Sequence, residues 1–383
     1  MVSINFNDVS YVIVGAGFYG SVIAERIAND LGKKVLLIDK RNHLGGNAFS
    51  EADSETNIEV HKYGSHLFHT SNEEVWNYLK RFTKFNDYQH KVFTKSKGKT
   101  YGMPINLDTI NSFYQKDLNP VEAEAFINSE IEKHKIEDPK NLEEKAISLV
   151  GKPLYEAFIK GYTKKQWQTD PKELPANIIT RLPFRFNYNS RYFKDKYEGL
   201  PVDGYGSIFK KMLDHPNISY HLGVDFFEIK ELIPEHVNII YSGPIDRFFN
   251  YKHGVLGWRT IDFEIQRVDM NDFQGTACMN YADEEVPWTR IHEYKHYHPE
   301  REQSNSKTII FKEFSRTAGK DDDPYYPINT TKDKEMYAKY VEETKSVRNV
   351  IFGGRLGTYS YLDMHQVISM ALNTYSSKIK NSI

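Results

Sequence analysis

The feature that most constrains the fold lies near the N-terminus, where a short apolar run enters a glycine-rich turn. Residues 11–14 read Tyr-Val-Ile-Val, and Gly15, Gly17 and Gly20 follow at the G-x-G-x-x-G spacing. Such an apolar run is typical of a parallel strand buried on both faces. The first glycine permits the tight turn, the second lets a pyrophosphate approach the backbone, and the third lets the next helix pack closely. The pattern predicts a strand, a phosphate-binding turn and a helix N-terminus.

The residues after this turn support the same interpretation. Apolar residues recur at helical spacing over residues 22–31, and Gly32 can end the helix. A second apolar run at residues 35–38 predicts another buried strand, and Asp39 follows it directly. An acidic residue at this place binds a ribose hydroxyl in dinucleotide-binding domains. The segment therefore predicts an adenine-dinucleotide site, and the alternative is a βαβ unit with a structural role only.

Length and composition limit the class of protein. The chain has 383 residues, which predicts two or three domains, and its formal net charge is −2. This balance lacks the basic excess typical of nucleic-acid or membrane-surface binding, so we expect a small-molecule partner and no nucleic acid. The 26 Tyr and 23 Phe favour a cleft lined with aromatic rings, although an aromatic core would account for them equally.

A cytoplasmic location is expected. The one cysteine, Cys278, cannot form an internal disulfide, and the N-terminus shows no basic-then-apolar signal segment. No apolar run approaches the length of about 18 residues that a membrane-spanning helix needs, so we expect no membrane insertion.

Two further loops carry polar groups that suggest a cofactor. Residues 40–47 read Lys-Arg-Asn-His-Leu-Gly-Gly-Asn. In flavoproteins of the glutathione-reductase and amine-oxidase type, such a basic Gly-Gly loop wraps an FAD, whereas a nicotinamide dehydrogenase does not need it. Residues 62–69 place His66 and His69 three apart, where they could face one ligand or pair for structural reasons. A zinc pair is the third possibility, but no further ligand follows at metal-site spacing, so no metal is predicted.

The rest of the chain predicts additional domains. Helical periodicity dominates the stretch after residue 107, and alternating segments at 259–265, 277–281 and 308–312 indicate an antiparallel sheet. The expected fold class is α/β, α+β overall, with an FAD-binding Rossmann-like domain (1–80, 200–242 and 344–383), an inserted helical domain (107–178) and an antiparallel β-sheet domain (81–106, 179–199 and 243–343).

The C-terminal segment repeats the geometry of the opening. Residues 349–352 predict a buried strand, Gly353 and Gly354 a tight turn, and residues 363–372 the start of a helix. A helix N-terminus stabilises negative charge by roughly 0.3–1 kcal/mol, so a second anion, such as the pyrimidine edge of a reduced flavin, could lie there. The alternative is simply the last βα unit of a doubly wound sheet.

Together the motifs resemble those of bacterial UDP-galactopyranose mutases along essentially the whole chain. The matching segments are Gly-Ala-Gly-Phe-Tyr-Gly, Asp-Lys-Arg-Asn-His-Leu-Gly-Gly-Asn, His-Lys-Tyr-Gly-Ser-His-Leu-Phe-His-Thr, Gly-Tyr-Thr-Lys-Lys-Gln-Trp, Phe-Gln-Gly, Pro-Trp-Thr-Arg, Pro-Tyr-Tyr-Pro and Phe-Gly-Gly-Arg-Leu. The resemblance implies a homodimeric flavoenzyme that interconverts UDP-galactopyranose and UDP-galactofuranose for cell-surface glycans. It also implies an FAD domain, a helical domain and a six-stranded antiparallel sheet.

The resemblance also implies roles for individual residues. Arg181 and Arg290 match two arginines that bind the diphosphate, and a guanidinium suits that group because it is always charged and matches phosphate oxygens in a fork. Trp167 matches the tryptophan of a mobile loop that closes over substrate, and His66 and His69 match a histidine loop beside the isoalloxazine. The other implied substrate contacts are Phe158, Tyr162, Thr163, Tyr192, Phe193, Asn280, Tyr326, Tyr361 and Asp363. The implied cofactor contacts are Gly15, Gly17, Phe18, Gly20, Asp39, Lys40, Gly46, Asn47, His66, Val224, Gly354, Arg355, Leu362, Asp363 and Met364.

The chemistry that the resemblance implies is an isomerisation without net redox change. N5 of reduced FAD attacks the anomeric carbon and expels UDP, and the flavin–sugar adduct permits exchange of the ring oxygen before UDP returns. Two positions depart from the family, since Asp39 stands where Glu is frequent and Trp288 where tyrosine is common. A mutase that acts on UDP-N-acetylgalactosamine is the alternative within this family.

Three other functions are compatible with parts of the sequence. An amine-oxidase-type flavoenzyme would share the flavin motifs, but it has no need for two arginines and a tryptophan loop aimed at a diphosphate. A nicotinamide-dependent nucleotide-sugar dehydrogenase would carry no flavin. A non-catalytic nucleotide-binding module would not need the histidine loop.

Overall fold

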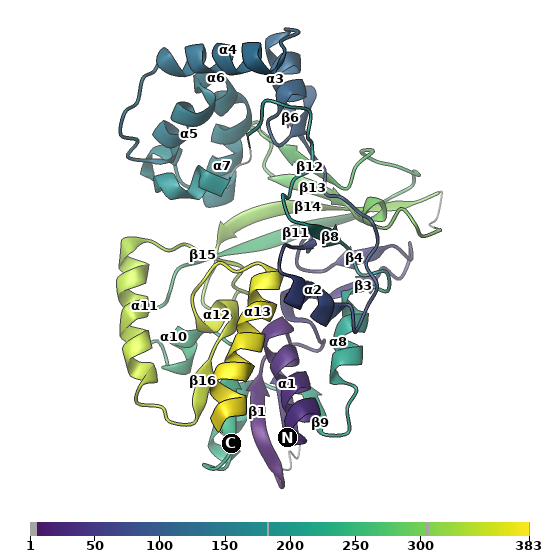
Figure 1. The fold of residues 1–383 in the computed structure, drawn as a ribbon, viewed down its shortest axis with the longest axis vertical. Helices are drawn as coiled ribbons and strands as arrows, with labels where there is room; N and C mark the ends of the chain where they lie inside the picture. Colours follow the sequence, from purple (N-terminus) through teal and green to yellow (C-terminus); the bar gives the residue numbers. More distant parts are fainter. Residues whose placement is uncertain (1–5, 182–183, 303–305, 383) are drawn as a thin grey trace.

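The computed structural model describes residues 6–181, 184–302 and 306–382 (Figure 1). A five-stranded sheet with the order β16-β10-β1-β2-β9 lies in the lower half of that view, and its neighbouring strands all run parallel. Because parallel strands end at one edge, the turns after β1 and β2 lie side by side. The Rossmann-like sheet expected from the sequence is therefore confirmed. Its strands are β16 (Val350–Phe352), β10 (Asn238–Tyr241), β1 (Val9–Val14), β2 (Lys34–Asp39) and β9 (Ile218–Leu222).

The helix α1 (Phe18–Leu31) begins directly after the glycine turn. It packs against α13 (Met364–Thr374) and α8 (Tyr205–Leu213), and the three helices share one apolar core with the sheet. Gly32 ends α1 with a φ of 61°, a left-handed conformation that glycine adopts without a Cβ clash. Residues of this core with no exposed side-chain surface include Ile13, Ile23, Leu37 and Ile208.

A second sheet has seven strands in the order β15-β11-β14-β13-β12-β6-β7. The six-stranded antiparallel sheet implied by the family resemblance was therefore wrong in two respects. The seventh strand, β15, is only two residues long and pairs with β11. The pair β12–β6 is parallel. In the chain, β6 precedes the helical region and β12 follows it, so no tight hairpin forces the two strands to run antiparallel. The strands are β15 (Tyr326–Pro327), β11 (Trp258–Val268), β14 (Thr308–Thr317), β13 (Arg290–Glu293), β12 (Cys278–Tyr281), β6 (Val92–Ser96) and β7 (Lys99–Met103).

A group of helices lies beyond this sheet, at the top of Figure 1. The side chains of Asn106, Asn119 and Asn141 each accept a backbone N–H at a helix start, which satisfies donors that have no partner inside the helix. These elements share an apolar core of their own with the near edge of the second sheet. They are α3 (Leu107–Tyr114), α4 (Pro120–Glu132), α5 (Leu142–Val150), α6 (Lys152–Leu154), the π-helical turn η2 (Tyr155–Ile159) and α7 (Lys160–Trp167).

Shorter elements complete the fold, and β5 pairs with β8 in a small separate sheet. The strands are β3 (Ser50–Ala52), β4 (Glu59–His61), β5 (Phe68–Thr70) and β8 (Tyr197–Gly199), and the helices are α2 (Glu73–Leu79), α9 (Phe226–Ile229), α10 (Ile245–Phe248), α11 (Thr331–Thr344) and α12 (Gly354–Gly357). The short turns are η1 (Gly46–Ala48), η3 (Pro171–Glu173), η4 (Ala176–Arg181), η5 (Lys230–Leu232), η6 (Tyr294–Tyr297), η7 (Tyr375–Ile379) and η8 (Lys380–Ser382). The domain boundaries proposed from the sequence stay a prediction.

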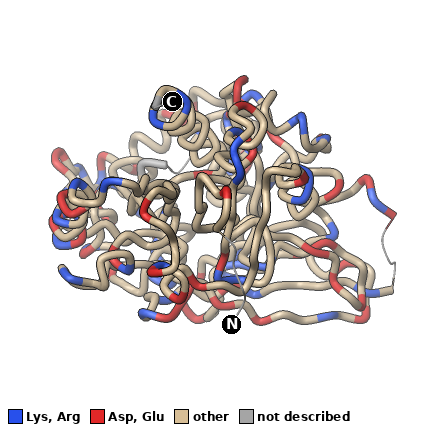
Figure 2. The backbone as a smooth tube through the Cα atoms, turned by 90° about the horizontal axis from the view of Figure 1, so that it is seen from below, with Lys and Arg blue, Asp and Glu red and all other residues tan. Residues whose placement is uncertain are grey.

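Charged residues of both signs are mixed along the chain. Figure 2 shows Lys and Arg positions interspersed with Asp and Glu positions along the tube. Within the described ranges, no helix is both long enough and apolar enough to cross a membrane.

The glycine turn gives a first testable prediction. A Cβ added at Gly20 would lie 2.0 Å from the carbonyl oxygen of Gly15 and 2.9 Å from Ile13 Cγ2, so α1 must move away. Overpacking of this kind costs roughly 1–3 kcal/mol. We expect Gly20→Ala to lower the melting temperature in a thermal-shift measurement. Gly102→Ala is the control, because its Cβ would meet no atom within 4 Å, and equal melting temperatures for the two variants would contradict the packing role.

Candidate active site

A cleft of about 810 Å³ lies at the carboxyl edge of the parallel sheet, where two glycine loops meet. The N–H of Gly45 donates to the Ala16 carbonyl at 2.8 Å, and a Cβ added at Gly46 would lie 3.2 Å from Gly17 Cα. Gly46 also has a φ of 56°, which L side chains rarely adopt. The backbones of the two loops therefore approach closely because neither carries a side chain, and they form a wall suited to a pyrophosphate.

Asp39 joins these loops at the end of β2. Its Oδ2 accepts the Ala16 N–H at 2.8 Å, and its Oδ1 accepts the Arg41 N–H at 2.8 Å. The side chain also lines the cleft. Because each carboxylate oxygen has a second lone pair, Asp39 can still accept a ribose hydroxyl.

The cleft collects most of the residues predicted to bind the cofactor. Gly20 is an exception because it packs α1 against the turn, and Asp363 is not in the lining although Leu362 and Met364 on either side are. The predicted residues that do line the cleft are Gly15, Gly17, Phe18, Asp39, Lys40, Gly46, Asn47, His66, Val224, Gly354, Arg355, Leu362 and Met364.

An acidic loop closes one side of the cleft, which sequence reasoning missed. Residues 318–324 line the cleft, and Asp323 pairs with Arg41 at 2.9 Å and with Lys40 at 3.5 Å. The basic loop that the sequence predicted to wrap the cofactor is thus tied to a segment just over 280 positions later. The Asp-Asp-Asp run at 321–323 was visible in the sequence, but its partner was not.

The histidine loop brings a neutral imidazole to the cleft. His66 lines the cleft, and its Nδ1 lies 2.7 Å from the Gly64 carbonyl, which can only accept, so Nδ1 carries a proton. Burial lowers the pKa of His66 to about 4. Its Nε2 is consequently an unprotonated acceptor at neutral pH.

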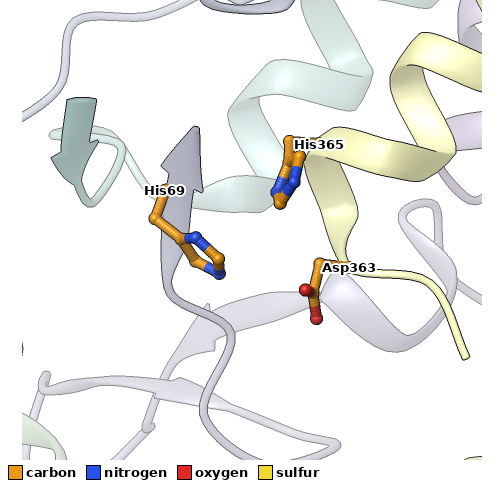
Figure 3. A group of neighbouring side chains, drawn as sticks. All are labelled: His69, Asp363 and His365. Carbon is orange, nitrogen blue, oxygen red and sulfur yellow. The ribbon is translucent and has the colours of Figure 1, made fainter. Parts of the chain in front are cut away.

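His69 lies in a different setting, shown in Figure 3. Its Nδ1 contacts Asp195 Oδ2 at 2.8 Å, and its ring stacks on Phe193 with centroids 3.7 Å apart. The side chains of His69, Asp363 and His365 face a common space, with one ligand atom of each within 4.8 Å of the others. Two imidazoles and a carboxylate could hold a divalent cation. The same donors could bind sugar hydroxyls, and the sequence prediction of no metal stays a prediction.

Arg290 lies on β13 and contacts the first turn of α7. Its Nη2 donates to the Tyr162 hydroxyl of α7, and its Nε lies 3.2 Å from Glu313 Oε1 on β14. Asn280 on β12 is its direct neighbour in the sheet register. Three residues predicted to bind substrate (Arg290, Tyr162 and Asn280) are thus brought together.

Two tyrosines predicted to bind substrate stack on one another. The rings of Tyr326 and Tyr361 have centroids 5.5 Å apart, and the guanidinium of Arg355 lies 5.4 Å from the Tyr361 ring centroid. Arg355 Nη1 donates to the Tyr325 carbonyl at 3.0 Å, and its Nε donates to the Leu362 carbonyl at 3.1 Å. Arg355 therefore fixes the two tyrosine-bearing loops at the edge of the cofactor cleft.

The C-terminal end of α7 is anchored on the second sheet. Lys165 Nζ donates to the carbonyls of Tyr281, Asp283, Val286 and Trp288 at 2.7–3.1 Å, and burial lowers its pKa to about 8. This ties the segment before Arg290 to the helix that carries Tyr162 and Trp167. Sequence reasoning gave Lys165 no role, although its motif was noted.

The remaining predicted substrate residues are less accessible or lie outside the description. Phe158 and Thr163 are 4% and 7% exposed, and the Phe158 ring packs 5.0 Å from that of Tyr101 in the helical core. Tyr192 packs edge-on against Phe193 at 5.1 Å. Arg181 ends η4, but the placement of its side chain lies outside the described residues.

Comparisons with known proteins agree with this arrangement. The family model "UDP-galactopyranose mutase" matches residues 157–361, and the model for an NAD(P)-binding Rossmann-like domain matches residues 13–82. The chain is 43% identical to dTDP-fucopyranose mutase of Escherichia coli, with 97% of this chain and 98% of the relative covered. It is 45% identical to a probable UDP-galactopyranose mutase of Klebsiella pneumoniae, with 96% and 94% covered. A crystal structure of reduced UDP-galactopyranose mutase shares the fold, with a TM-score of 0.70 at 14% identity and coverage of 97% and 96%.

The Rossmann-like sheet, the cleft and these matches define an isomerase that uses a flavin-type cofactor. The chain belongs to the UDP-galactopyranose mutase family. The resemblance inferred from its motifs is thereby confirmed.

The low pKa of His66 gives a prediction for stability against pH. Its pKa is about 4 in the folded protein and about 6.5 when unfolded, so its contribution is complete above pH 6.5 and is lost as pH falls toward 4. In this window, we expect His66→Gln to reduce the slope of unfolding free energy against pH by up to about 1.4 kcal/mol per pH unit. Urea unfolding at several pH values measures this slope. His236→Gln, which replaces an exposed histidine, is measured as the control. An unchanged slope in His66→Gln would contradict a neutral His66 beside the cleft.

Proposed function

We propose that the protein interconverts UDP-galactopyranose and UDP-galactofuranose, with FAD as its cofactor. The observation that carries this proposal is made where the two sheets meet, because Arg290 lies there close to the loop that bears His66. Glu313, the partner of Arg290, would be 4.0 Å from a Cβ on Gly64, in the loop that presents His66 to the cofactor cleft. A cation suited to a nucleotide diphosphate therefore lies beside the site of a flavin-type cofactor.

FAD fits the cleft because the polar groups that line the cleft match the successive parts of the FAD molecule. The paired glycine loops suit the pyrophosphate, Asp39 suits a ribose hydroxyl, and the start of α13 at Met364 suits the negatively charged edge of a reduced flavin. When bound and reduced, FAD supplies a nucleophile toward the anomeric carbon of the sugar. Acid precipitation of the purified yellow protein should release FAD, and a protein that cannot be reconstituted with FAD would contradict the assignment.

The protein's own groups bind and orient the substrate. Arg290, with Arg181 as its proposed counterpart, binds the diphosphate and stabilises the charge on UDP when the bond to the sugar breaks. Tyr326 and Tyr361 offer hydroxyls and ring faces to the sugar at the cleft edge. Closure of the loop that bears Trp167 would exclude water.

A second candidate activity has support from one relative. The Escherichia coli protein, at 43% identity, is named for dTDP-fucopyranose, which differs in both nucleotide and sugar. Separate incubations of the reduced enzyme with UDP-galactose, dTDP-fucose and UDP-N-acetylgalactosamine, followed by chromatography of furanose products, decide among these substrates. We expect the highest kcat/KM with UDP-galactose, and a preference for dTDP-fucose would replace the first proposal by the second.

The proposed setting of the enzyme follows the family. We propose a homodimer that acts in the cytoplasm and supplies galactofuranose for cell-surface polysaccharides. The proposed domains keep the boundaries expected from the sequence, with residues 107–178 as the helical domain. The helical region and the Rossmann-like sheet belong to two different apolar cores, which supports a boundary between these two, and residues of the second sheet take part in both cores.

Substitution of the arginines tests the substrate site. Arg290→Ala and Arg181→Ala should each lower kcat/KM by one to two orders of magnitude with FAD retained, because a charge-assisted contact contributes roughly 1.5–3 kcal/mol. Arg→Lys should restore only part of the activity, since lysine lacks the planar fork. Arg267→Ala is the control, because Arg267 on β11 pairs instead with Asp53 and Glu55. Near-normal kinetics in both alanine variants would locate the substrate elsewhere.

A further inference from the structure

The register of the second sheet aligns several polar side chains on one face. Arg290 on β13 is directly opposite Glu313 on β14 and Asn280 on β12. Directly paired residues project to the same face, and so does a residue two positions along a strand. His292 therefore lies on the same face as Arg290, next to Glu313.

Glu313 uses its two carboxylate oxygens for two different partners. Oε1 lies 3.2 Å from Arg290 Nε, and Oε2 lies 2.9 Å from His292 Nε2. Arg290 Nε has no hydrogen-bond acceptor within the described chain, so its contact with Glu313 is an ion pair. The guanidinium is held between Glu313 at Nε and the Tyr162 hydroxyl at Nη2.

His292 links this carboxylate to the histidine loop. Its Nδ1 lies 2.7 Å from Ser65 Oγ, which is itself 2.6 Å from the Tyr297 hydroxyl. Ser65 directly precedes His66, which lines the cofactor cleft. Polar contacts thus connect Ser65, the chain neighbour of His66, to the arginine proposed for the diphosphate.

Burial makes these contacts strong constraints. His292 is 1% exposed and Glu313 is 6% exposed, so water does not compete for their polar atoms. Burial alone would raise the pKa of Glu313. Arg290 and His292 lower it by more than burial raises it, so the pKa of Glu313 lies below its usual value. Loss of either partner would leave a carboxylate desolvated and incompletely paired, which is costly.

We propose that Glu313 and His292 are positioning residues that orient the Arg290 guanidinium toward the substrate's diphosphate. This inference rests on the proposed function. It adds to the site two residues to which the sequence analysis assigned no role. Neither residue needs to touch substrate, because each acts through Arg290. Ser65 holds the Nδ1 side of His292 and leaves Nε2 for Glu313.

A double-mutant cycle on nucleotide binding tests the proposal. The dissociation constant of UDP, with dTDP as a second probe, is measured by calorimetry on the oxidised FAD-loaded protein, so no turnover is needed. Glu313→Gln should weaken binding about tenfold, and the same substitution should have no further effect in an Arg290→Ala background. Glu264→Gln is the control, because this exposed carboxylate on β11 pairs with Lys312 at 2.9 Å.

The outcomes separate the inference from the proposed function. Unchanged affinity in Glu313→Gln, or an equal loss in the wild-type and Arg290→Ala backgrounds, would overturn the positioning role. If Glu313→Gln does not fold, His292→Gln takes its place, with an expected loss of about threefold that also disappears without Arg290. A wild-type protein that binds neither UDP nor dTDP would remove the proposed function and this inference together.

Discussion

The site depends on the close approach of two backbones at the carboxyl edge of the parallel sheet. Gly17 and Gly46 lie so near each other that a Cβ on Gly46 would be 3.2 Å from Gly17 Cα, and Asp39 bonds to the N–H groups of Ala16 and Arg41 beside them. The parallel pairing of β1 and β2 makes this approach possible, because it ends both strands at the same edge. The cofactor cleft is therefore a direct consequence of strand direction and of glycine at two positions.

Residues proposed to bind substrate lie on the second sheet. Its strands bring Asn280, Arg290 and Glu313 into one row, and Lys165 holds the preceding segment to the end of α7. The histidine loop lies between this row and the cleft, since Ser65 contacts His292 and His66 lines the cleft. The active site is thus assembled from two sheets and the end of one helix, each with its own structural reason for its position.

The sequence predicted the local elements and the motifs that meet at the cleft, because both depend on short-range patterns. The G-x-G-x-x-G turn, Asp39 and the Gly-Gly loop are short motifs, and in the structure they lie around one cleft. The prediction of a wholly antiparallel second sheet was wrong, because β12 pairs in parallel with β6, a strand about 185 residues away in the chain. The partnerships of Arg41 with Asp323 and of Glu313 with Arg290 and His292 were missed for the same reason, since strand register decides them. Asp195 and His365 likewise join His69 only through tertiary packing.

The central claim is that the bound flavin works without net redox change, and a count of product per reduction tests it most directly. The FAD-loaded protein is reduced once with dithionite, excess reductant is removed without air, and furanose product is counted against flavin. The account predicts many product molecules per flavin reduced and almost none from the air-oxidised protein. Full activity of the oxidised protein, or product limited to one equivalent per reduction, would contradict the account even if FAD binding were established.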